Sequence, residues 1–137
     1  MTGDPERRGD VVVYIDHSDV RMSRLRELEQ GIRRVVDVIE EREPQLIAYG
    51  FHIDEERAQM TVTAVHPDSA SLELHLEIGR EEFRKLADLI TLRKIEVYGS
   101  IDAHVRQMLE QKVSMLGAGE VVVTERFAGF GRPTPTR

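Results

Sequence analysis

Two apolar runs separated by four polar residues constrain the fold of this chain more than any other part of its sequence. The runs occupy 46–53 (LIAYGFHI) and 58–66 (AQMTVTAVH), and 54–57 (DEER) connects them. A polar connection this short between two strand-like runs predicts a β-hairpin. Both faces of the second strand carry apolar residues: Met60, Val62 and Ala64 on one, Val65 on the other. A sheet that is covered on both faces produces this pattern.

One strand and one long helix are expected before the hairpin. Residues 11–16 (VVVYID) have the β-branched and aromatic composition of a buried strand. The short polar side chains of 17–19 are expected to cap the helix that follows. Within 23–43 the apolar residues lie mostly three or four positions apart, which places them on one helical face, and Pro44 ends the helix.

The segment 72–78 (LELHLEI) fits two kinds of element. Its apolar and polar residues alternate with period two, which alone indicates a strand. The preceding 67–69 (PDS) is a helix-start signature, and the residue types of the segment are not typical of strands. We therefore favour a helix, interrupted at Gly79 and followed by a second helix over 81–90.

The C-terminal part of the chain predicts a strand, a helix and a last strand. The first strand is 93–98 (RKIEVY), and Ser100 is expected to cap a helix that extends to Leu116. Residues 119–130 (GEVVVTERFAGF) supply the last strand. The predicted order is therefore β-α-β-β-α-β followed by α-β.

This order predicts an α+β domain, a ferredoxin-like split β-α-β with an added C-terminal α-β unit. We expect one domain over 11–130. The polar ends, 1–10 and 131–137, contain too little apolar surface to offset the entropy of ordering, so flexible tails are expected there.

Composition excludes several classes of function. The 137 residues include no cysteine, which excludes disulfides, thiol catalysis and thiolate zinc sites. The 25 acidic and 19 basic residues give a net charge of −6, which disfavours nucleic acid as a partner. No apolar run is long enough for a membrane span, and residues 1–10 lack the apolar stretch of a secretory signal. We expect a cytoplasmic protein with no membrane partner.

Three segments give the chain a resemblance to a known superfamily. They are 11–19 (VVVYIDHSD), 46–75 (LIAYGFHIDEERAQMTVTAVHPDSASLELH) and 95–99 (IEVYG). With the split β-α-β order, they make the chain resemble the dimeric α/β-barrel superfamily, and within it the antibiotic-biosynthesis-monooxygenase-type domains. The resemblance implies helices on one sheet face, a second subunit on the other, and a small-molecule pocket between the sheet and its helices.

The functional residues of the best-known members cannot be placed on this sequence. Members that degrade haem use an Asn, a His and a Trp, and members that form polyketide quinones tend to use Asn and Trp. This chain contains neither tryptophan nor asparagine. The resemblance therefore predicts the fold more specifically than the reaction.

Histidines are the candidate catalytic residues, because an unperturbed histidine titrates near neutral pH. His66 ends the second hairpin strand and His75 lies nine residues later in the expected helix. In a ferredoxin-like fold both positions could meet at one end of the pocket, where a histidine could deprotonate an activated phenol or 1,3-dicarbonyl. The alternative is that His66 caps the following turn and that His75 is half-exposed.

Four further side chains on expected strands are candidate ligand-binding residues: Tyr14, Tyr49, His52 and Tyr98. Gly50 beside them marks either a bulge or a close ligand approach. Core packing is the alternative for each aromatic side chain. No HExxH motif, dinucleotide fingerprint or phosphate-binding loop is present, so we expect no metal and no tightly bound cofactor.

The sequence thus predicts a homodimeric domain that binds a small molecule. By resemblance, it would be a cofactor-independent monooxygenase, or an isomerase, acting on an aromatic or cyclic metabolite. The alternative is a non-catalytic ligand-binding or assembly module, because the fold alone does not choose between these classes.

Overall fold

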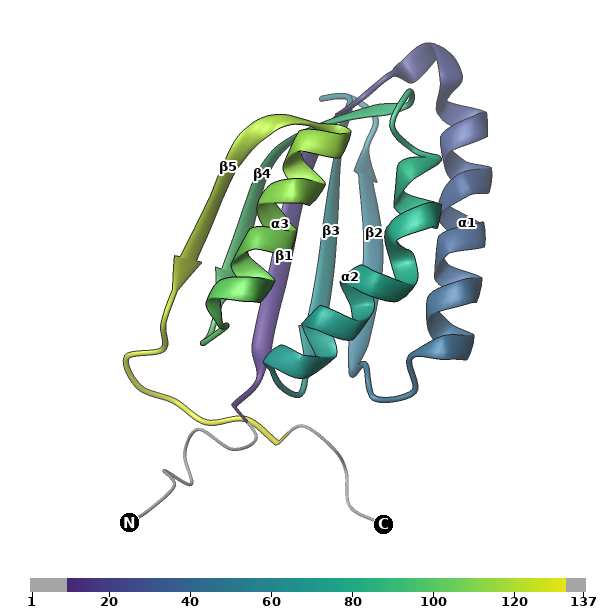
Figure 1. The fold of residues 1–137 in the computed structure, drawn as a ribbon. Coiled ribbons are helices and arrows are strands. Elements are labelled where there is room, and N and C mark those ends of the chain that lie inside the picture. The colour runs from purple at the N-terminus through teal and green to yellow at the C-terminus, as the bar shows by residue number, and fades with distance from the viewer. Residues whose placement is uncertain (1–9, 133–137) are drawn as a thin grey trace, which may run out of the picture.

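The computed structural model describes residues 10–132, in which helices cover one face of a five-stranded sheet (Figure 1). The elements in chain order are β1 (Val12–Val20), a short 3-10 turn η1 (Met22–Arg24), α1 (Leu25–Arg42), β2 (Ala48–Asp54), β3 (Gln59–His66), α2 (Ser69–Arg84), β4 (Ile90–Tyr98), α3 (Ala103–Leu116) and β5 (Gly117–Thr124). The predicted tails, 1–10 and 131–137, lie outside the described residues except for Asp10, Gly131 and Arg132.

The strands lie in the order β2-β3-β1-β4-β5. The pairs β2–β3, β3–β1 and β1–β4 are antiparallel, while β4 and β5 are parallel and are connected by α3. The first four strands have the ferredoxin-like arrangement, and α3 with β5 is the added C-terminal unit. The predicted α+β fold class is confirmed.

Strand alternation decides which side chains face the helices. In β1 the buried residues are Val12, Tyr14, Asp16, Ser18 and Val20, every second position of the strand. Because successive side chains of a strand point to opposite faces, all five lie under the helices. Polar groups therefore enter the core in the middle of an otherwise apolar face.

The strand β1 is longer than predicted. Residues 17–19, expected to cap a helix, continue the strand, and His17 is paired with Thr61 of β3 and Lys94 of β4. Central strands gain hydrogen bonds on both edges, and this pairing outweighs the local preference of short polar residues for a helix cap. The helix cap prediction at 17–19 is wrong.

The helix α2 is uninterrupted, so the predicted break at Gly79 and the separate helix over 81–90 are wrong. Its start is as predicted, since Asp68 caps it by accepting a hydrogen bond from the backbone amide of Ser71 at 2.8 Å. Gly79 is buried against the ring of Phe83 one turn later, where a Cβ atom would overlap the ring. The glycine therefore makes room for Phe83 and does not end the helix.

The remaining boundaries shift by a few residues. The cap of α3 is Asp102, not Ser100, because the Asp102 carboxylate accepts the amide hydrogen of Val105. The last strand is Gly117–Thr124, and a Cβ atom at Gly119 would overlap the backbone of Arg93 in β4. Gly50 marks no bulge, since the β2–β3 pairing is regular through it.

Within residues 10–132, none of the helices has the length and apolar character that crossing a membrane requires.

The packing of Phe83 against Gly79 generates a stability prediction. Replacing Gly by Ala inside a helix normally raises the free energy of unfolding by about 1 kcal/mol. In Gly79→Ala, however, the added methyl group displaces a buried ring. We expect a net loss of about 1–3 kcal/mol in the free energy of unfolding, measured by urea denaturation.

The matched control is Gly31→Ala in α1, where the new Cβ atom would meet the flexible end of Leu86 at 2.7 Å and the end of Arg34 at an ordinary contact distance of 3.8 Å. We expect a smaller loss there. In a Phe83→Leu background the Gly79→Ala substitution should become neutral or stabilising. An equal loss with and without the Phe83 ring would contradict this account of Gly79.

Candidate functional site

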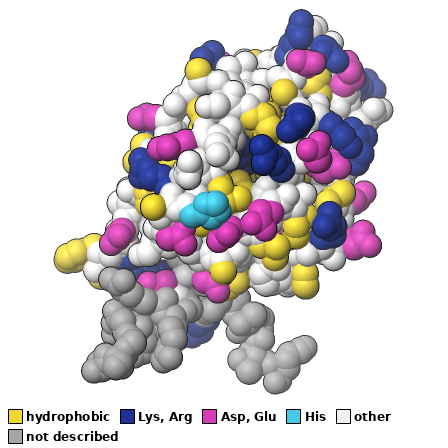
Figure 2. All heavy atoms as spheres, viewed as in Figure 1, with side chains coloured by type: hydrophobic (Ala, Val, Ile, Leu, Met, Phe, Trp, Pro, Cys, Tyr) yellow, Lys and Arg dark blue, Asp and Glu magenta, His cyan; other side chains and the backbone are white. Residues whose placement is uncertain are grey.

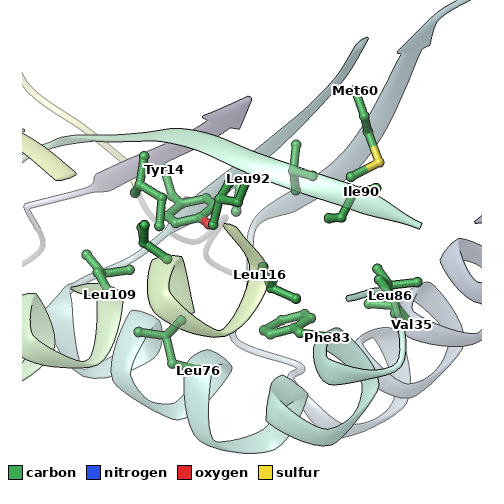
Figure 3. Packing of buried hydrophobic residues seen from close by; sticks show 14 of the residues in the cluster. Tyr14, Val35, Met60, Leu76, Phe83, Leu86, Ile90, Leu92, Leu109 and Leu116 are labelled. Carbon is green, nitrogen blue, oxygen red and sulfur yellow. The ribbon is translucent and has the colours of Figure 1, made fainter. Parts of the chain in front are cut away.

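A buried polar cluster lies between the sheet and the helices. Tyr14, Asp16 and Ser18 enter it from β1, and Lys112 enters it from α3. All four residues are buried, although Asp and Lys are rarely buried without partners. In Figure 3 the Tyr14 hydroxyl points from the sheet toward the helices, where Leu116 and Phe83 lie.

Hydrogen bonds connect three members of this cluster. Lys112 Nζ donates to Tyr14 Oη at 2.8 Å, and the Tyr14 hydroxyl in turn donates to Asp16 Oδ2. Lys112 Nζ also lies 3.5 Å from Asp16 Oδ2, and it sits 4.2 Å from the centroid of the Phe83 ring. The buried ammonium therefore has an anion, a hydroxyl and an aromatic face as partners, which together offset its loss of water.

Burial sets the protonation of the cluster. It raises the pKa of Tyr14 well above its ordinary value, and the neighbouring Asp16 charge acts in the same direction. Burial also lowers the pKa of Lys112, while the Asp16 carboxylate opposes that shift. Tyr14 consequently remains a protonated hydrogen-bond donor at physiological pH.

Two oxygens of the cluster have no hydrogen-bond partner among the described residues. They are Asp16 Oδ1 and Ser18 Oγ, and both residues line a small, partly open cavity together with Tyr49, Phe83 and Lys112. The cavity offers about 20 Å³ of space, enough for a single water molecule. A buried oxygen without a partner is costly, so these atoms mark the place where a polar ligand atom gains most.

A second group, of histidines, lies beside the cavity. His75 Nδ1 is 3.0 Å from each carboxylate oxygen of Glu43, which follows the end of α1. His66 Nδ1 is 2.8 Å from Ser71 Oγ, and Gln45 Nε2 donates to the same hydroxyl at 3.0 Å. The His66 and His75 ring centroids are 5.3 Å apart.

Burial favours the uncharged form of each titrating group here. It raises the pKa of Glu43 to about 7. It lowers the pKa of both histidines to about 3, and the charge of Lys112 contributes to that lowering. Below pH 7 the pair is therefore a neutral carboxylic acid hydrogen-bonded to a neutral imidazole.

Tyr49 and Phe83 connect the two groups of polar residues. The Tyr49 ring packs edge-on at 5.1 Å from the His75 ring, and Tyr49 also lines the cavity. The Phe83 ring centroid lies 5.4 Å from that of His75, and the Phe83 ring also contacts Lys112 Nζ. The site thus has a charged end at β1 and a neutral end at the start of α2, separated by two aromatic rings.

Four of the six predicted site residues come together in this region: Tyr14, Tyr49, His66 and His75. His75 is buried, so the alternative in which it is half-exposed is wrong. His52 and Tyr98 lie on the opposite sheet face, where His52 is paired with Thr61, and the Tyr98 hydroxyl donates to Glu96 at 3.0 Å. The structure does not bring these two residues to the site.

The sequence interpretation missed five polar residues of the site: Asp16, Ser18, Glu43, Ser71 and Lys112. Extending the period-two pattern of Tyr14 along β1 would have placed Asp16 and Ser18 on the buried face. Lys112 follows Val105 by seven positions and Leu109 by three, which puts it on the buried stripe of its helix. A lysine inside an apolar stripe was the available signal.

The fold matches solved structures over most of the chain. MupZ from Pseudomonas fluorescens superposes with a TM-score of 0.70 at 17% identity, over 93% of this chain and 99% of MupZ. A Caulobacter crescentus CB15 protein proposed to be an antibiotic biosynthesis monooxygenase gives 0.61 at 12% identity, over 70% and 94%. A variant of SnoaB, a cofactor-independent oxygenase from Streptomyces nogalater, gives 0.56 at 16% identity, over 66% and 93%.

This chain has the fold that these solved structures share. The structural matches confirm, at the level of the fold, the resemblance inferred from its sequence. No family model matches the sequence, and no curated protein does. A shared fold does not by itself define a reaction, so the chemistry of this chain has to be argued from its site.

The raised pKa of Glu43 generates a pH-dependent prediction. A carboxyl with a raised pKa in the folded state contributes stability fully below its ordinary pKa of 4.5 and loses that contribution as the pH rises through about 7. Glu43→Gln cannot ionise. The substitution should therefore change the free energy of unfolding more favourably at pH 8 than at pH 5, and the two changes should differ by about 2 kcal/mol.

Urea unfolding at the two pH values measures this difference. Glu41→Gln, which removes a charge from an exposed position of the same helix, is the matched control and should have the same small effect at both values. The explanation fails if Glu43→Gln changes the free energy of unfolding equally at pH 5 and pH 8.

Proposed function

We propose that this domain binds a small cyclic or aromatic molecule in the cavity between its sheet and helices and transfers a proton on it without a cofactor. The observation that carries the proposal is Asp16 Oδ1, which is buried and has no hydrogen-bond partner among the described residues, in a residue that lines the same cavity as Lys112. A carboxylate oxygen without a hydrogen-bond partner is available to accept a proton from a ligand.

In this proposal the two oxygens of Asp16 have different tasks. Oδ2 is held by the Tyr14 hydroxyl and the Lys112 ammonium, which fix the carboxylate in place. Oδ1 is left to act as general base toward a C–H or O–H beside a carbonyl group. Lys112 and Ser18 line the same cavity, and their donors would stabilise the negative charge that develops on the ligand oxygen.

The deprotonated ligand has two outcomes. Return of the proton to a different carbon atom is an isomerisation. Reaction of the carbanion with molecular oxygen is an oxygenation, and the fold similarity to SnoaB, a cofactor-independent oxygenase, supports including it. Binding without either reaction is the non-catalytic alternative.

His66 and His75 enter the proposal as positioning residues. Their pKa values of about 3 make them weak bases. Neither histidine lines the cavity, whereas Asp16 does. The His75 ring packs against Tyr49, whose side chain lines the cavity. The histidine pair therefore acts on the ligand through the orientation of Tyr49.

The cavity must widen to admit a ligand, since it now has room for one water molecule. Phe83 and Met60 are among the apolar side chains that line it. Methionine is flexible and adapts to differently shaped neighbours, so its movement is the least costly way to enlarge the site.

Deuterium exchange on 2-tetralone tests the proposal, because this cyclic aromatic ketone has exchangeable protons beside its carbonyl. The protein should accelerate incorporation of deuterium from D₂O, followed by proton NMR. Asp16→Asn should slow the exchange at least about 100-fold. Lys112→Met should also slow it, because the ammonium that stabilises the enolate is lost.

Tyr98→Phe, on the opposite sheet face, is the control and should leave the rate unchanged. Amide NMR spectra verify that each variant is folded. An oxygen electrode separates oxygenation from isomerisation. Probe binding without exchange would support the non-catalytic alternative, and a rate equal to buffer with no binding at all would contradict the proposal.

We also propose that the domain is a homodimer through its open sheet face. Apolar residues of this face do not pack against the core: Val13 and Ile15 of β1, Val65 of β3 and the exposed Val122 of β5. These apolar side chains lie among polar ones such as His17, Thr61 and Glu96 on the face that no described helix covers, and a second copy of the same sheet is suited to cover them. The structure describes a single chain, and the open face is what supports this arrangement.

Sedimentation equilibrium at micromolar concentration tests the dimer. We expect twice the chain mass of 15.7 kDa. Ile15→Lys places a charge at the centre of the open face and should shift the mass to that of a monomer, while Glu110→Lys on the exposed side of α3 should not. A monomer for the unsubstituted protein would contradict the proposal.

A further inference from the structure

A surface groove runs between α2 and α3 on the helical side of the domain. It encloses about 320 Å³, which is at the lower end of the range for small-molecule sites, about 300–1,000 Å³. Phe83 and Lys112 form part of its wall, and these two residues also line the cavity beside Asp16. The groove therefore adjoins the cavity at these two side chains.

The charge of the groove is opposite to that of the whole chain. Arg80 and Arg84 lie on its α2 side and are exposed, four positions and hence one helical turn apart. Among the described residues that line the groove there is no Asp or Glu. In a chain of net charge −6, this concentration of cations is a local feature that attracts anions.

The two arginines are free to bind a ligand. Arg84 Nη2 lies 3.8 Å from Glu81 Oε2, and both side chains are more than half exposed, so this ion pair contributes little and is easily exchanged. The planar guanidinium group suits the paired oxygens of a carboxylate or phosphate. Figure 2, which views the helical face, shows basic side chains beside hydrophobic ones near its centre.

The rest of the groove is suited to an apolar body. Met108 and Met115 lie seven positions apart on α3, on the same helical face, and Leu76 and Phe83 face them from α2. Methionine side chains adapt to differently shaped apolar groups. The groove thus combines a cationic edge with an adaptable apolar floor.

We propose that the groove between α2 and α3 binds the anionic end of the ligand, so that the substrate class is an apolar ring or chain carrying one carboxylate or phosphate group. Arg80 and Arg84 hold the anion, and the apolar body lies along the methionines toward Phe83 and Lys112. This inference rests on the proposed function for the position of the reacting end, and it adds the charge of the ligand.

Titration of ¹⁵N-labelled protein with three matched probes tests the inference: 1-naphthoate, 1-naphthyl phosphate and the neutral 1-naphthamide. We expect the better of the two anions to bind at least tenfold more tightly than the amide and to shift the backbone amide signals of 80–84 and 108–115. Whichever anion is preferred identifies the group as carboxylate or phosphate.

The double variant Arg80→Gln with Arg84→Gln should weaken binding of the preferred anion at least tenfold and leave the amide unchanged. Arg26→Gln with Arg33→Gln, at exposed positions of α1, removes the same charge elsewhere and is the matched control. Equal binding of anion and amide, or equal weakening by the control variant, overturns the inference.

The test separates this inference from the proposed function. If the amide binds as well as the anions and shifts signals of 14–18, the cavity proposal stands and the charge preference is wrong. If an anion binds through Arg80 and Arg84 and deuterium exchange on 2-tetralone is not accelerated, the groove is an anion site and the cavity chemistry is wrong.

Discussion

The arrangement of the helices over the sheet depends on the contacts of one buried ammonium group, that of Lys112. Lys112 and its hydrogen-bond partner Tyr14 are 98 positions apart in the sequence, and Asp16 stands two positions beyond Tyr14. Removing either ion would leave the other buried and unpaired, a loss of several kcal/mol. Because Phe83 covers the ammonium from α2, strand β1 and helices α2 and α3 all have to be in place for the charge to be satisfied.

The ammonium also contributes to the uncharged state of the histidines. Burial is the main reason that the pKa of each ring is lowered, and the positive charge of Lys112 acts in the same direction. The hydrogen-bond partner of the neutral His75 is Glu43, whose raised pKa makes its carboxyl group easily protonated. One domain core thus contains a charged pair and an uncharged pair of ionisable groups, separated by the rings of Tyr49 and Phe83.

The fold could be predicted from periodicity, while most of the site could not. The hairpin and the helix that begins after Asp68 follow from local patterns, and tertiary contacts did not override them. The role of Gly79 was predicted wrongly because it depends on packing against a buried ring one turn later, and the sequence pattern does not reveal that packing. The polar residues of β1 and Glu43 were missed because their burial depends on partners far away in the sequence, which no single-segment pattern reveals.

Helix α3 follows β4 and precedes β5 in the chain. This late position affects when the charge of Asp16 is neutralised during synthesis. The cation that neutralises Asp16 belongs to the last helix, so a growing polypeptide that has emerged only as far as β4 carries the carboxylate on its central strand without its counter-ion. Burying the Asp16 carboxylate without Lys112 is costly, so in such an intermediate water or a bound proton has to satisfy it. Closure of the core around an ionised Asp16 therefore waits for the final helix, which makes it a late event in the formation of this domain.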